Sequence, residues 1–123
     1  METSITVISL ILIAFFAFAS SIKILAWQKF IFETQLKFFI SYGLNREMMF
    51  MVGVIELTGA STLWFQQDPI GLVGALLIFM TSIGAIGFHF KFDTWKDAIP
   101  AIATGLLSGF LVLAHPVFKA LIN

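Results

Sequence analysis

Four long apolar segments, separated by shorter polar ones, run along the chain. They cover about residues 5–27, 48–65, 71–90 and 98–121. Each is close to the roughly 20 residues that an α-helix needs to cross the hydrocarbon core of a bilayer. The pattern therefore predicts an all-α fold, a transmembrane four-helix bundle that forms a single integral membrane domain over residues 1–123.

The connections between these segments differ in length. The second, Gln66–Ile70, contains Pro69 and leaves room only for a tight turn, so the helices on either side are expected to form an antiparallel hairpin. The third, Lys91–Asp97, is similarly short. Only the first connection, Gln28–Glu47, is long enough to hold a structure of its own.

Within that first connection, charged and apolar residues alternate with a helical period. Lys29, Glu33 and Lys37 recur at four-residue intervals, and phenylalanine and isoleucine lie between them. This pattern predicts a short amphipathic helix at the membrane interface, ending at Tyr42–Gly43.

Composition supports the membrane assignment and excludes several functions. Hydrophobic residues make up 59% of the chain and charged residues 11%, with a mean hydropathy of +1.00. The net charge is zero and no basic tract occurs, so nucleic acid is not an expected partner. The chain contains no cysteine, which excludes disulfides and thiolate metal sites, and no metal site is predicted.

The distribution of basic residues predicts the orientation. The first and third connections carry five of them, and the last segment carries only Lys119; the five are Lys29, Lys37, Arg46, Lys91 and Lys96. Under the positive-inside rule both termini are expected outside, in a bacterial cytoplasmic (inner) membrane. Ala17-Phe18-Ala19 resembles a signal cleavage site, but no basic n-region precedes it, so the first segment is expected to be retained.

Three ionisable residues fall inside the apolar segments and are the main site candidates. Glu56 lies in the middle of the second, where a carboxylate costs about 2.5 to 3.5 kcal/mol unless it is partnered. Lys23 and His89 lie near the same end of their own helices, and all three side chains lean toward a common level. We expect a buried polar cluster of Lys23, Glu56 and His89, with Tyr42 and Asp93 at its rim.

Each member also has a purely structural interpretation. Lys23 could snorkel to the interface, and His89 could be an interfacial histidine bonded to a carbonyl. Glu56 could be a protonated carboxyl that hydrogen-bonds between helices, so whether it is ionised stays open. No catalytic residue can be named from these alternatives.

Small residues indicate where helices approach closely. Gly53 and Gly59 lie three residues before and after Glu56, and Ala85 belongs to a small-residue stripe that ends at His89. Such residues let neighbouring membrane helices come into close contact.

The order of these motifs resembles the DoxX-like family of small four-helix membrane proteins. The resemblance rests on Ser20-Ser21-x-Lys23, Tyr42-Gly43-Leu44, Gly53-x-x-Glu56-x-x-Gly59, and Gly84-Ala85 followed by His89 and Asp93. It runs from about Phe16 to Val112, and the chain departs from it at Ser21, where many relatives have glycine. It implies the fold more firmly than the activity, since relatives include a subunit associated with thiosulfate:quinone oxidoreduction, members of oxidative-stress membrane complexes and a receptor assembly chaperone.

Three functions are therefore considered. The first is an accessory or assembly factor of a membrane complex, with another membrane protein or a second copy of the chain as partner. The second is a quinone-linked oxidoreductase component, in which Glu56 or His89 exchanges protons with a quinone. The third is a small proton-coupled transporter. The chain offers no cofactor ligands of its own, and a quinone or lipid bound between helices is the expected small molecule.

Overall fold

All regular structure in the described part of the chain is α-helical. The computed structural model describes residues 2–66 and 68–123, so the predicted turn at Gln66–Ile70 is described except for Gln67, which lies outside these residues. The helices are α1 (Glu2–Leu25), α2 (Lys29–Ser41), α3 (Arg46–Leu63), α4 (Pro69–Phe92), α5 (Ile99–Ala114) and α6 (Pro116–Ile122).

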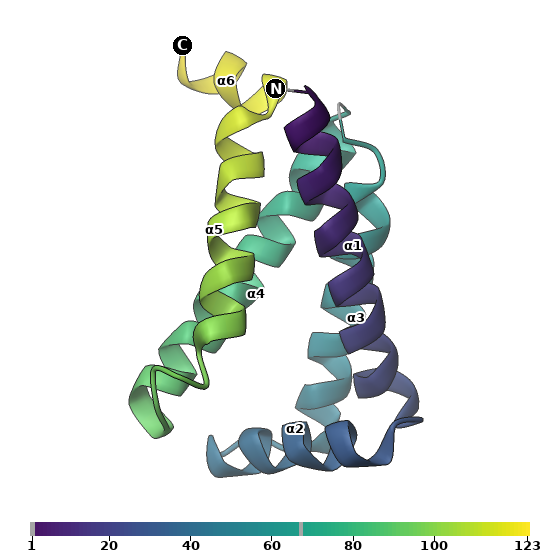
Figure 1. The fold of residues 1–123 in the computed structure, drawn as a ribbon, viewed down its shortest axis with the longest axis vertical. Coiled ribbons are helices and arrows are strands. Elements are labelled where there is room, and N and C mark those ends of the chain that lie inside the picture. The colour runs from purple at the N-terminus through teal and green to yellow at the C-terminus, as the bar shows by residue number, and fades with distance from the viewer. Residues whose placement is uncertain (1, 67) are drawn as a thin grey trace.

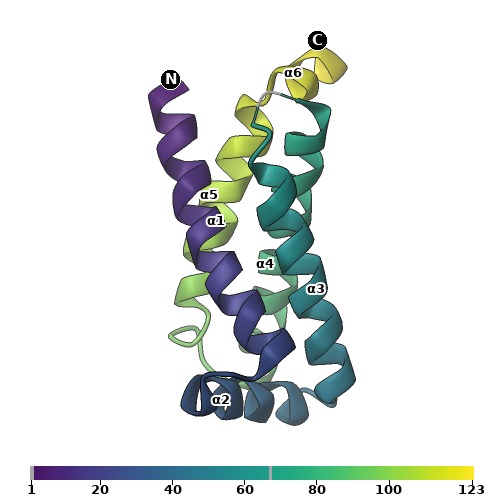
Figure 2. The same ribbon diagram turned by 90° about the vertical axis from the view of Figure 1, so that its right-hand side faces the viewer.

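Four of these helices run along the long axis of the molecule and pack side by side. α1 packs against α3 and α5, and α4 packs against the same two helices. α2 lies across the end opposite the two termini, where the α4–α5 connection also lies (Figures 1 and 2). The first and third connections are therefore at the same end of the molecule.

Hydropathy distinguishes the long helices from one another. α1, over Thr3–Leu25, and α4 are each long and apolar enough to cross a membrane, and α5 with α6 would form a third span if the bent pair is counted as one. α3 is shorter and contains Arg46, Glu47 and Glu56. These apolar helices are those of an integral membrane protein.

The expected helix in the first connection is present as α2. Gln28 begins it by accepting a hydrogen bond from the backbone N–H of Ile31, at 2.8 Å. It ends at Tyr42, followed by Gly43 at φ +84°, a left-handed conformation that glycine adopts without strain. Asn45 then caps α3 by accepting from the N–H of Met48.

The fourth apolar segment was expected to be one helix reaching residue 121, and this prediction was wrong. It is broken at His115, and α5 and α6 are bent by 66°. Pro116 has no N–H to donate, and its ring excludes the helical continuation. His115 Nδ1 accepts from the N–H of Val117, so Nε2 carries the proton and donates to the Asp68 carbonyl at 2.9 Å.

The apolar core fills the half of the molecule nearer the termini. It combines the first part of α1 and α4 with the last part of α3 and α5: Leu12, Phe16, Ala60, Leu63, Leu72, Ala75, Ile78, Leu111 and Val112. α3 and α4 meet through Gly59 and Gly74, where a Cβ on Gly74 would lie 2.7 Å from the backbone nitrogen of Leu63. The hairpin is therefore closed tightly at this end.

Candidate functional site

An ion pair joins the last turn of α1 to the middle of α3. Lys23 Nζ is 3.0 Å from Glu56 Oε1, and the two residues are 7% and 6% exposed. Gly53, one turn before Glu56, makes the approach possible, because a Cβ there would lie 2.9 Å from Lys23 Cβ. A buried charge is tolerated when a partner of opposite charge is this close.

The pair keeps unused hydrogen-bonding capacity. Glu56 Oε1 lies at ion-pair distance from the ammonium but makes no well-directed hydrogen bond within the described residues. A carboxylate can accept about four hydrogen bonds and an ammonium can donate three. Both groups can therefore bind a further polar group.

That capacity faces a cavity of about 690 Å³. The cavity lies toward the α2 end, where α1 and α3 diverge from α4 and α5 (Figure 1). Its wall is mostly apolar and includes Phe15, Phe38 and Met80, with Lys23 and Glu56 among its few charged members. This size and lining are typical of sites for small molecules.

Other polar residues also line the cavity, and three of them bear on its structure. Ser82 of α4 and Thr104 of α5 hydrogen-bond each other at 2.8 Å, which joins these two helices at the wall. Gln35 of α2 also lines the cavity, and its Oε1 is buried without a partner within the described residues.

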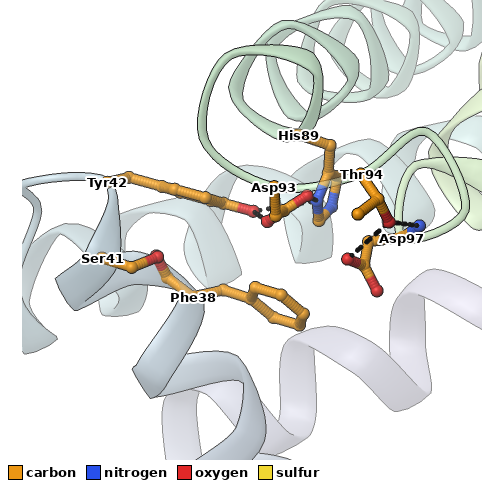
Figure 3. Close-up of polar contacts among 7 residues, drawn as sticks. All are labelled: Phe38, Ser41, Tyr42, His89, Asp93, Thr94 and Asp97. Carbon is orange, nitrogen blue, oxygen red and sulfur yellow. Dashed lines mark hydrogen bonds and ion pairs between the residues drawn. The ribbon is translucent and has the colours of Figure 1, made fainter.

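A second polar group lies where α2 meets the end of α4 (Figure 3). Asp93 accepts from both neighbours: Tyr42 Oη donates to Oδ2 at 2.9 Å, and His89 Nδ1 lies 2.8 Å from Oδ1. Tyr42 Oη also lies 2.9 Å from His89 Nδ1. Aromatic rings enclose this group, since the Tyr42 ring stacks on Phe88 at a centroid distance of 5.0 Å.

The charges of this group shift its acid–base equilibria. Burial raises the pKa of Asp93, but the hydrogen bonds from His89 and Tyr42 lower it by more, so the pKa lies below its ordinary value. Burial, the hydrogen bond to Asp93 and the negative charges of Asp93 and Asp97 together raise the pKa of the Tyr42 phenol far above its ordinary value. Asp93 is thus an anion and Tyr42 a neutral donor at neutral pH.

The candidate residues fall into two groups rather than one cluster. Lys23 and Glu56 are paired directly, whereas His89 is bonded to Tyr42 and Asp93, the two residues expected at the rim. Among the described residues, no hydrogen bond or ion pair joins His89 to the Lys23–Glu56 pair. The two groups share the cavity, which His89 and Tyr42 also line.

The small residues also differ in role. Gly53 lies against α1 and Gly59 against α4, where a Cβ would be 2.9 Å from Ile78 Cγ1. The stripe on α4 is buried as far as Ser82. Ala85 lies beyond that point and lines the cavity.

Two residues of this region were not identified from the sequence. Gln35 lies between Glu33 and Lys37 of the amphipathic helix, so the sequence pattern did not distinguish it from residues on the solvent-exposed face of that helix. Arg46 donates to the Ile24 carbonyl at 3.2 Å and lies 4.9 Å over the Phe32 ring, so it joins α1, α2 and α3. Arg46 is the first residue of α3, where a positive charge opposes the helix dipole. This unfavourable position was the signal in the sequence that Arg46 has a specific partner.

No metal site accompanies these groups. In residues 2–66 and 68–123, no three histidine or acidic side chains come together in a way that could hold a metal ion.

The Lys23–Glu56 pair predicts non-additive substitutions. Glu56→Gln or Lys23→Met alone leaves a buried charge without its partner and should lower the free energy of unfolding by about 3 to 5 kcal/mol. The double substitution should lower it by less than the sum of the two single effects. Thermal unfolding in detergent measures all three variants, and strict additivity would show that the two charges do not interact in the folded protein.

The Tyr42–Asp93 bond predicts an unusual titration of the only tyrosine. Because the pKa is raised in the folded protein, the stabilising contribution is complete below the ordinary tyrosine value of about 10 and is lost as pH rises through the higher folded value. The phenolate absorbance should therefore appear far above the pH at which free tyrosine ionises. Asp93→Asn should bring it closer to the ordinary value, and an ordinary titration in the folded wild type would contradict the bond.

Comparison with known proteins places the chain in a family. No curated protein and no solved structure matches it. The model of the DoxX-like family matches residues 7–114, which includes Lys23, Glu56, Tyr42, His89 and Asp93. The match covers most of the chain and agrees with its apolar helices, so this integral membrane protein belongs to the DoxX-like family.

Proposed function

We propose that the chain is the quinone-binding membrane component of an oxidoreductase, and that it holds the quinone in the cavity beside Lys23 and Glu56. The observation that carries this proposal is the cavity itself: about 690 Å³, mostly apolar, with a buried ion pair on its wall. A quinone has an apolar tail and a polar ring, and the cavity offers surfaces for both.

The proposal includes a placement in the bilayer. α1, α3, α4 and α5 each cross it, and α2 lies at the interface. α3 is the least apolar of the four, but it packs between α1 and α4 and directs its central carboxylate toward Lys23 and away from lipid. α2 has no buried residue and lies across the end of the other helices, which suits a position at the headgroups.

The polar groups of the cavity suit a quinone headgroup. The Lys23 ammonium can donate to a carbonyl oxygen of the ring, and Glu56 can accept from a hydroxyl once the ring is reduced. His89 lines the same cavity, and its imidazole can hydrogen-bond to an oxygen of the ring. The protein would hold the ring and its protons, and electrons would come from a partner protein, because the sequence contains no cysteine and only two histidines.

The cavity also distinguishes this function from the other two considered. A pure assembly factor has no need of a small-molecule cavity with unused polar groups. A transporter needs access from both sides, whereas the half of this molecule nearer the termini is filled by the apolar core. One part of the assembly-factor function is kept in this proposal: the quinone-binding component must associate with the protein that donates its electrons.

A cavity-filling substitution tests where the ligand binds. A benzoquinone with a ten-carbon tail should raise the thermal unfolding temperature of the purified protein, because binding to the folded state stabilises it. Ala85→Trp places a large side chain in the cavity and should abolish this rise. The control is Ile83→Trp on the same helix, at a position that is exposed and outside the cavity, and it should keep the rise.

The outcomes of this experiment separate the site from the function. An equal rise in wild type and Ala85→Trp would mean that the quinone binds elsewhere. If the quinone does not stabilise the wild type at any concentration, the proposed function is wrong.

The orientation is proposed from the basic residues. With four crossings, α2 and the α4–α5 connection face the cytoplasm of a bacterial inner membrane and both termini face outside. A reporter fused after Asn123 that is active only outside the cytoplasm should then be active. Activity of a cytoplasm-specific reporter at the same position would reverse the assignment.

A further inference from the structure

The hydrogen bonds of His89 determine which of its ring nitrogens faces a ligand. Asp93 is an anion and can only accept, so the 2.8 Å contact between its Oδ1 and His89 Nδ1 requires a proton on Nδ1. Tyr42 donates its own proton to Asp93 Oδ2 and has none left for the histidine. In the neutral imidazole, Nε2 therefore carries a lone pair.

That lone pair is available to the cavity. His89 lines the cavity, and within the described residues its Nε2 makes no hydrogen bond. In the same wall, Gln35 Oε1 has no hydrogen-bond donor within the described residues, and Glu56 Oε1 has the Lys23 ammonium at 3.0 Å. The Lys23 ammonium, already paired with Glu56, is the cation among the lining residues.

We propose that the cavity selects the reduced, hydroxylated form of its ligand, and that His89 Nε2, positioned by Asp93, accepts the hydrogen bond from a ring hydroxyl. This inference rests on the proposed function and specifies the form of the quinone that binds. A hydroquinone brings two O–H donors, and His89 Nε2 and Gln35 Oε1 are acceptors in the wall without a donor among the described residues. A quinone brings only acceptors, so His89 Nε2 and Gln35 Oε1 stay unpaired and desolvated when it binds.

The tautomer can be measured without any substitution. The chain has two histidines, and the structure gives them opposite tautomers: Nδ1–H for His89 and Nε2–H for His115. Nitrogen NMR of the histidine-labelled protein in detergent at pH 8 should therefore show one of each. Two Nε2–H histidines would overturn the inference.

The selection itself is tested with three probes that share a ten-carbon tail: a hydroquinone, its dimethyl ether and the benzoquinone. At pH 8 and without oxygen, the hydroquinone should bind about 3 to 10 times more tightly than the ether or the quinone, the range of one hydrogen bond. The ether cannot donate a hydrogen bond and undergoes no redox reaction, so it separates hydrogen bonding from electron transfer.

Two variants assign the effect to Asp93. In Asp93→Asn, the new amide can donate to His89 Nδ1 as well as accept from it, so Nε2–H should appear in the spectrum and the preference should be lost. Tyr42→Phe keeps the Asp93–His89 bond, so it should keep both the Nδ1–H tautomer of His89 and the preference for the hydroquinone. An unchanged preference in Asp93→Asn would overturn the inference, as would equal binding of the three probes to the wild type. If none of the three binds, the proposed function fails and this inference fails with it.

Discussion

A buried charge in a membrane protein needs a partner, and this requirement determines how α1 and α3 pack. Lys23 and Glu56 each would be costly alone among apolar helices, and they meet at 3.0 Å. The contact demands close helix backbones, which Gly53 allows because it has no side chain facing Lys23. The pair fixes one wall of the cavity, and the opposite wall is fixed separately by the Ser82–Thr104 bond between α4 and α5.

The two walls are joined differently at their two ends. Toward the termini, Gly59 and Gly74 bring α3 and α4 together, and His115 bonds the α3–α4 turn to the break before α6. Toward the other end, the link across the cavity is α2, held to α4 by Tyr42 and its bond to Asp93. The cavity therefore lies between a tightly closed half of the molecule and an end that is bridged by one short helix.

The sequence was informative where a residue type conflicts with its surroundings. Glu56 in an apolar segment has few stable solutions, so a partner from a neighbouring helix was foreseeable, and so was the helix in the first connection from its charge period. The contact between Tyr42 and Asp93 was not foreseeable, because residues 51 positions apart meet only through the path of α2. The break at His115 required weighing one proline against a continuous apolar pattern, and the backbone constraint prevailed over hydropathy.

The cavity also means that the stability of this protein is unevenly distributed. The half near the termini has a continuous apolar core. The half near α2 has fewer apolar contacts, so local opening is expected to begin there. A molecule that filled the cavity would add contacts to that half alone, so it would suppress local opening near α2 more than near the termini.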